Sequence, residues 1–156
     1  MTPSYPVGLI WLRRDLRLAD NAALYHALQQ CEKLYCVFVF DDGILAALPH
    51  ADRRVEFICQ SLAELDAALR ETSGRPQTGL ITRRGLPQDI IPALARQLGA
   101  GAVFCNDDDE PAALARDALV ARSLKSQGQL LLRFKDHRIF ARDEVLTQSL
   151  TPFSVF

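Results

Sequence analysis

The segment "VGLIWLRRDLRLADNAAL", residues 7–24, decides the fold because it contains a strand, a turn and the beginning of a helix. Residues 7–12 form a continuous apolar run, which is typical of a strand covered on both faces of a sheet. A basic cluster follows directly, and Asp20 is a candidate N-cap for the helical pattern after it. A buried strand that leads through a short turn into a helix predicts a parallel α/β sheet.

The rest of the chain repeats this alternation of strand and helix. Four more apolar, β-rich runs predict strands at 33–40, 78–83, 101–106 and 129–134. Between them, helical patterns run from about 52 to 73, from 85 to 98 and from 109 to 127. We therefore predict an α/β fold, a Rossmann-like, doubly wound five-stranded parallel sheet of order 3-2-1-4-5 with helices on both faces.

Local signals mark the ends of the three later helices. The helix after Asp52 repeats apolar residues at a 3-4-3-4 spacing and ends before Gly74. The next has Pro87 in its first turn and Gly99 just past its end, and the last has Asp109 as a candidate cap. After residue 134 the helical period is lost. We assign residues 1–134 to one domain and expect 135–156 to begin a linker whose continuation has been cut away.

Composition describes a soluble globular domain of 156 residues with 18 basic and 19 acidic side chains, a net charge of -1. This balance gives no electrostatic reason to bind DNA or an anionic membrane. No run approaches the roughly 20 apolar residues of a membrane span, and no signal sequence is apparent. The four scattered cysteines form no CxxC pair, which indicates buried, reduced thiols and a cytoplasmic location.

Charged residues cluster directly after the first and fourth predicted strands. In parallel α/β sheets ligands bind outside the carboxyl ends of the strands, where the strand order reverses. The predicted order places the arginines of residues 13–17 opposite the acidic run 107–110 at that point. Two interpretations stay open: a structural ion-pair network, or guanidinium and carboxylate groups that hydrogen-bond a planar ligand.

Familiar catalytic signatures are missing from the sequence. There is no GxGxxG or GxxxxGK[ST], and the three histidines lie in unrelated segments. The acidic run lacks the spacing and the glycine of a calcium loop. We therefore predict no catalytic residue and no metal ligand, and interpret the chain as a ligand-binding domain.

Four blocks of the chain resemble the DNA photolyase/cryptochrome family, in the family's order and spacing. They are "WLRRDLRLADNAAL", "RRVEFICQSLAELDAAL", "GLPQDIIPALARQLGAGAVFCNDDDEPAALARD" and "DEVLTQSLTPFSVF". The resemblance implies that residues 1–134 are the antenna-chromophore domain of a bacterial deoxyribodipyrimidine photolyase. It implies that a helical domain, absent here, binds FAD and damaged DNA. The full-length enzyme, a carbon–carbon lyase, is then expected to split cyclobutane pyrimidine dimers by blue-light-driven electron transfer from FAD, and this chain alone to repair nothing.

The resemblance also implies a light-harvesting chromophore between the first and fourth strands, bound by Arg14, Arg54, Asp108 and Glu110. Folate-binding relatives carry an Asn-Glu pair where this chain has alanines, at 112 and 113. Because alanine cannot hydrogen-bond a pterin through its side chain, we expect an 8-hydroxy-5-deazaflavin or FMN antenna, or an empty pocket, rather than folate.

Two other functions compete with this interpretation. The chain is alternatively the N-terminal domain of a cryptochrome-type blue-light photoreceptor, although the "DEVLTQSLTPFSVF" block favours a photolyase. A nucleotide-binding protein of the universal-stress type would need a glycine-rich phosphate loop, which the run after the fourth strand does not provide. Loss of the helical domain is expected to expose an apolar docking face, through which the chain would self-associate.

Overall fold

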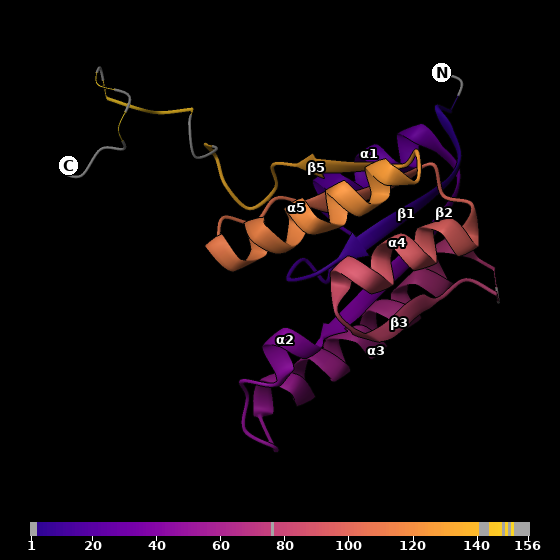
Figure 1. Cartoon of the computed structure of the whole chain (residues 1–156). Helices are drawn as coiled ribbons and strands as arrows, with labels where there is room; N and C mark the ends of the chain where they lie inside the picture. The colour runs from indigo at the N-terminus through magenta and orange to yellow at the C-terminus, as the bar shows by residue number, and fades with distance from the viewer. Residues whose placement is uncertain (1–2, 76, 141–143, 148, 150, 152–156) are drawn as a thin grey trace.

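Five parallel strands form the centre of the molecule (Figure 1). The computed structural model describes residues 3–75, 77–140, 144–147, 149 and 151. The strands are β1 (Tyr5–Leu12), β2 (Cys31–Asp41), β3 (Leu80–Gly85), β4 (Ala102–Asn106) and β5 (Leu130–Phe134). Their order is β3-β2-β1-β4-β5 with every neighbouring pair parallel, so the predicted order is confirmed.

Helices cover both faces of the sheet, as predicted. They are α1 (Ala22–Gln30), α2 (Asp42–Leu45), α3 (Arg53–Ser73), α4 (Pro87–Leu98) and α5 (Pro111–Ser126). Leu9 and Trp11 of β1 join the core beneath α4 and α5, whereas Ile10 and Leu12 join the core beneath α1 and α3. Because alternate residues of β1 are buried on opposite faces, its sequence is apolar without interruption.

The ends of α3 and α4 are those that the sequence predicts. The Asp52 side chain accepts a hydrogen bond from the Arg54 amide at 2.8 Å, and α3 ends at Gly74 with a φ of 61°. In α4, Pro87 is in the first turn and Gly99 has a φ of 68°. Both glycines adopt the left-handed conformation that allows them to end a helix.

Two predicted caps are wrong. The N-cap of α1 is Asn21, whose side chain accepts from the Leu24 amide at 3.1 Å, and Asp20 instead lies in a turn with a φ of 51°. The N-cap of α5 is Glu110, because Pro111 begins the helix with a fixed φ and needs no hydrogen-bond acceptor for its nitrogen. Asp109 pairs with Arg138 instead.

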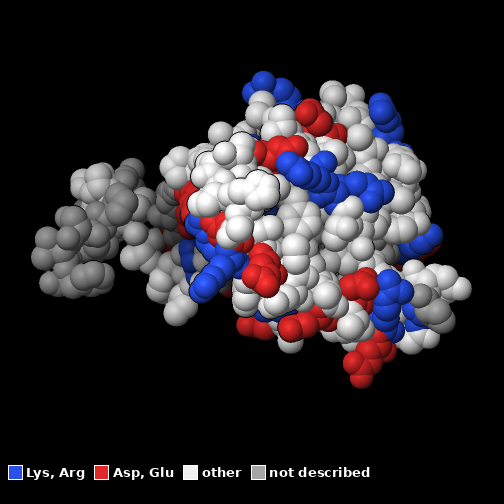
Figure 2. Space-filling view, turned by 90° about the horizontal axis from the view of Figure 1, so that it is seen from below, with Lys and Arg blue, Asp and Glu red and all other residues white. Residues whose placement is uncertain are grey.

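The first turns of α3 and the short α2 project from the sheet, at the lower end of Figure 1. Of the apolar face predicted for α3, only Leu62 and Leu65 are buried. Two large apolar side chains of this projection are exposed to solvent, Ile44 at 55% and Phe57 at 68%. We call residues 42–61 the α2–α3 projection. Figure 2 shows acidic and basic side chains interspersed on the lower side of the molecule, without a dominant region of one sign.

Candidate functional site

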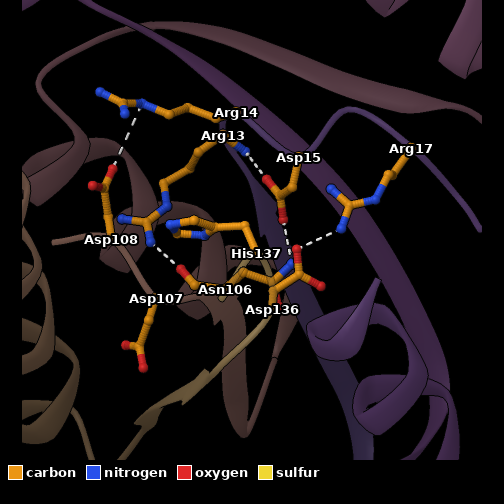
Figure 3. A pocket seen from close by; sticks show the side chains of 9 residues that line it. All are labelled: Arg13, Arg14, Asp15, Arg17, Asn106, Asp107, Asp108, Asp136 and His137. Carbon is orange, nitrogen blue, oxygen red and sulfur yellow. Dashed lines mark hydrogen bonds and ion pairs between the residues drawn. The ribbon is translucent and has the colours of Figure 1, made fainter. Parts of the chain in front are cut away.

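A cavity of about 240 Å³ lies at the carboxyl ends of β1 and β4 (Figure 3). Three segments line it: the turn after β1, the end of β4 with its loop, and the residues after β5. Its nine lining residues are all polar or charged: Arg13, Arg14, Asp15, Arg17, Asn106, Asp107, Asp108, Asp136 and His137. The arginines after the first strand and the acidic run after the fourth therefore face each other, as the strand order predicts.

Arg13 forms a structural ion pair. Its guanidinium group donates two hydrogen bonds to Asp117 of α5, at 2.7 and 2.8 Å, and the Asp117 side chain is only 1% exposed. It also donates to the carbonyl of Asn106, and lies 4.9 Å from the centre of the Trp11 ring. Arg116 lies 5.1 Å from the same ring. Arg13 thus joins β1 to α5, and for this residue the structural interpretation holds.

The floor of the cavity is a buried network of amide and carboxylate groups. The Asn106 side-chain nitrogen donates to Asp15 at 2.6 Å and to Asn21 at 3.0 Å. The second oxygen of Asp15 accepts from the backbone amide of Arg13 at 2.8 Å. Because these buried polar groups are hydrogen-bonded to one another, the turn after β1 is held in one conformation.

Three side-chain oxygens accept hydrogen bonds from the free backbone amides at the N-terminus of α1. The amides of Ala22, Ala23 and Leu24 donate, in that order, to Asp136 at 2.9 Å, Asn106 at 2.8 Å and Asn21 at 3.1 Å. In dinucleotide-binding folds, the helix after the first strand presents these free amides to a pyrophosphate. In this chain the protein itself satisfies them, which agrees with the absence of a GxGxxG motif.

Arg14, Asp108 and Glu110 lie together at the edge of the cavity. The Arg14 side chain is 69% exposed, and its nitrogens lie 3.7 Å from Asp108 and 2.6 Å from Glu110. Its bond to Glu110 raises the pKa of Arg14. Burial alone would raise the pKa of Asp108, but the Glu110 amide and the nearby arginines outweigh it and leave this pKa lowered. Both groups therefore stay charged at neutral pH, and Arg14 keeps an exposed face for a ligand.

Arg54 does not line this cavity. It lies in the first turn of α3, is 70% exposed, and hydrogen-bonds Asp52 at 2.6 and 2.9 Å. The structure brings together three of the four residues proposed to bind a chromophore. Arg14 and Asp108 line the cavity, and Glu110 lies beside it as an ion-pair partner of Arg14. The role of Arg54 in binding stays a prediction.

Asp136 and His137 were not predicted as site residues, because everything after residue 134 was assigned to a linker. The other polar residues of the site were identified because they follow directly after a strand. Asp136 and His137 follow β5 in the same way. The domain boundary after residue 134 stays a prediction. Even so, contacts from Asp136 and Arg138 attach the first residues of this segment to the sheet.

Among the residues that the structure describes, no group of three or more His, Cys, Asp or Glu side chains is placed to hold a metal ion. None of the described helices combines the length and the apolar character that crossing a membrane requires.

All four cysteines are free thiols, but they differ in burial. Cys36 and Cys105 are buried, Cys31 is half-buried and Cys59 is exposed, so the expectation of burial is wrong for Cys59. Burial raises the pKa of Cys36 to about 11 and that of Cys105 to about 12.

A doubly wound parallel sheet with a polar cavity at its reversal point defines the class of ligand-binding α/β domains. Within that class, the chain belongs to the DNA photolyase family, whose model matches residues 8–156. The chain is 38% identical over 148 residues to a deoxyribodipyrimidine photo-lyase from Synechococcus sp. PCC 6301, covering 95% of this chain and 30% of that protein. It is 32% identical over 136 residues to cryptochrome-2 of Gallus gallus, covering 87% of this chain and 23% of that protein.

The fold comparison agrees with the sequence comparison. The crystal structure of an archaeal photolyase from Sulfolobus tokodaii matches with a TM-score of 0.76 and 26% identity, covering 88% of this chain and 32% of that one. That structure contains two FAD molecules and implicates a novel light-harvesting cofactor. The chain spans less than a third of the length of these named relatives.

Proposed function

We propose that this chain is the light-harvesting α/β domain of a DNA photolyase, and that the cavity between β1 and β4 binds its antenna chromophore. The chromophore would absorb light and pass excitation energy to FAD in a helical domain, which would bind damaged DNA and split cyclobutane pyrimidine dimers. The chain alone would repair nothing, and we place the protein in the cytoplasm. Family membership and the photo-lyase relative support this proposal. The observation that carries it is the exposed Arg14 guanidinium beside a polar cavity at the reversal point.

The lining of the cavity fits the edge of a flavin-like heterocycle. Arg14 offers donors, and the carboxylates of Asp107 and Asp108 offer acceptors. The dione edge of a flavin or deazaflavin ring alternates carbonyl and N–H groups, and therefore needs both kinds of partner. Ala112 and Ala113 do not line the cavity, and Ala113 is buried. Neither gives a folate pterin a polar side chain.

The charge of the lining favours a ligand without a phosphate group. Three arginines and four aspartates line the cavity, a formal charge of 3 − 4 = −1 with His137 neutral. Each arginine already contacts a carboxylate: Arg13 pairs with Asp117, Arg14 with Asp108 and Glu110, and Arg17 with Asp136. A phosphate would meet net repulsion here. Between the two flavin-like ligands, this favours the phosphate-free 8-hydroxy-5-deazaflavin over FMN.

Binding of three chromophores to the 156-residue chain tests the proposal. We expect 8-hydroxy-5-deazaflavin to bind more tightly than FMN, and methenyltetrahydrofolate to bind weakest. Arg14→Ala should raise the deazaflavin Kd by about tenfold or more, the cost of one charge-assisted hydrogen bond, with little change in Tm. The matched control is Arg84→Ala, which removes an arginine that is 73% exposed and pairs with Asp42 at 2.7 Å outside the cavity. Preferential folate binding, or equal losses in both variants, would contradict the proposal.

A cryptochrome-type photoreceptor is the second candidate, favoured by the 32% identity to the Gallus gallus cryptochrome. The two candidates differ in chemistry on DNA. We expect a full-length protein that contains this domain to restore DNA containing thymine dimers under blue light. Binding of FAD and chromophore without any repair would favour the photoreceptor.

A further inference from the structure

Residues 135–138, which we call the strap, cross the carboxyl end of the sheet after β5. The Asp136 side chain is 4% exposed, accepts the Ala22 amide at 2.9 Å and pairs with Arg17 at 2.6 Å. Arg138 pairs with Asp109 on the loop after β4. The strap is therefore attached to two different parts of the domain, one on each side of His137.

His137 lies between these attachments and lines the cavity. Figure 3 shows its ring among Arg13, Asn106 and Asp136, which places the strap at the cavity wall. His137 lies in neither a helix nor a strand. Its position depends on the attachments of its neighbours in the chain.

Asp136 is the stronger attachment, for a physical reason. A nearly buried carboxylate is costly unless it is hydrogen-bonded and paired, and Asp136 has both an amide and a guanidinium partner. The amide belongs to the first residue of α1, where the helix dipole also favours a negative charge. Both interactions would be lost if the strap moved away from the sheet.

We propose that Asp136 is a positioning residue, which holds His137 as a wall of the chromophore cavity and so controls how fast the bound chromophore leaves. This inference rests on the proposed function of the cavity. It also implies the reverse effect. A chromophore that contacts His137 stabilises the attached strap by the same free energy by which the attached strap stabilises binding.

Four variants of the 156-residue chain test this role. Asp136→Asn keeps an oxygen for the Ala22 amide but removes the charge that pairs with Arg17. Arg17→Gln weakens the same ion pair by changing Arg17, the more exposed of its two side chains. It replaces Asp136→Asn in the test if that variant does not fold. His137→Ala removes the wall and keeps the attachment. Lys135→Gln is the control, because Lys135 pairs with Glu144 at 2.7 Å and does not line the cavity.

Two measurements separate positioning from a general loss of structure. In stopped-flow displacement of 8-hydroxy-5-deazaflavin, we expect Asp136→Asn or Arg17→Gln to release the ligand about tenfold faster, with a much smaller effect on the association rate. In hydrogen exchange, the amides of residues 135–138 and Ala22 should exchange faster in these two variants. His137→Ala should weaken binding without faster exchange at Ala22, and Lys135→Gln should match the wild type.

The outcomes distinguish this inference from the proposed function. Faster exchange of the strap with unchanged release of the ligand would overturn the positioning role and leave the proposed function intact. Failure of the wild-type chain to bind any of the three chromophores would overturn both. Equal acceleration of release by Lys135→Gln would also overturn the role, because that variant leaves the Asp136 attachment intact.

Discussion

Two adjacent arginines, Arg13 and Arg14, have opposite roles at the end of β1. The Arg13 side chain is 9% exposed and is bound to Asp117, whereas that of Arg14 is 69% exposed and faces the acidic loop. Their surroundings, and not their residue type, separate the structural interpretation from the ligand-binding one. Residue type alone left both interpretations open for each arginine, and only the family resemblance assigned Arg14 to the ligand.

This difference predicts unequal effects on stability. Arg13→Met should lower the free energy of unfolding by about 3 kcal/mol, because Asp117 stays buried with its weaker partner Arg116, at 3.2 Å. Arg14→Met removes a largely exposed pair and should cost less than about 1 kcal/mol. Urea denaturation of the two variants checks this. Similar losses in both would show that Arg14 also has a structural role.

The partners of Arg14 could be predicted from the sequence, but the partner of Arg13 could not. Arg14, Asp108 and Glu110 follow strand ends that the topology brings to one edge, and the family resemblance singled them out among the charged residues there. The partner of Arg13 is 104 residues away on the buried side of α5, and nothing in the local pattern around Asp117 distinguishes it from a surface aspartate. Long-range partners of this kind depend on the packing of helices on the sheet.

At the scale of single elements, local signals and distant contacts each determine some helix ends. Asp52 and Gly74 were predicted correctly because each acts within its own helix. The first turn of α1 instead takes oxygens from Asn106 and Asp136, residues 83 and 114 positions away from the amides they accept. A sequence window around α1 contains neither residue, so these two acceptors could not be predicted. The N-cap itself is local, but it is Asn21, one residue after the predicted Asp20.

Removing the α1 cap should destabilise the domain by about 2 kcal/mol. Asn21→Ala removes the acceptor for the Leu24 amide and leaves the buried side-chain nitrogen of Asn106 with one partner fewer. Thermal unfolding measures this loss. Asp20→Gly is the matched control, since glycine accepts the φ of 51° at this position and the Asp20 side chain does not cap the helix. A larger loss in the control would restore Asp20 as the cap.

The cap of α3 predicts a dependence of stability on pH. Side-chain and backbone hydrogen bonds from Arg54 lower the pKa of Asp52 to about 2. Because the folded pKa is lower than the ordinary value near 4, the unfolded chain binds the proton more tightly, and Asp52 contributes stability above about pH 4 that is lost toward pH 2. The difference in Tm between wild type and Asp52→Ala should therefore be largest near neutrality and shrink as the pH falls through this range. A constant difference would contradict the shifted pKa.

At the scale of the molecule, the strand order was predictable and the α2–α3 projection was not. Short strands alternating with helices leave few right-handed parallel arrangements, and the sheet adopts the one predicted. The 3-4-3-4 pattern of α3 predicted one buried face along its whole length. The helix extends past the sheet, however, so that Val55 and Ile58 of this face are only half-buried.

The sequence predicts self-association through the docking face of an absent helical domain, and the exposed projection offers a separate contact site. We propose that two copies associate through the apolar side chains of the α2–α3 projection, Ile44 and Phe57. Phe57→Ser should then raise the dimer Kd by about tenfold, the loss expected when one large apolar contact is removed. Light scattering across a concentration series measures this. Leu119→Ser, at a residue that is 44% exposed on α5, is the control. Equal weakening by both variants would locate the contact elsewhere.

The single tryptophan of the chain, enclosed by two guanidinium groups, has a practical consequence. Since Arg13 contacts both the indole and the cavity, intrinsic emission originates a few side chains from the proposed pigment. A bound pigment that absorbs in the near ultraviolet would quench that emission. Titrations can then be followed optically without any attached dye, and the same signal reports when the domain unfolds.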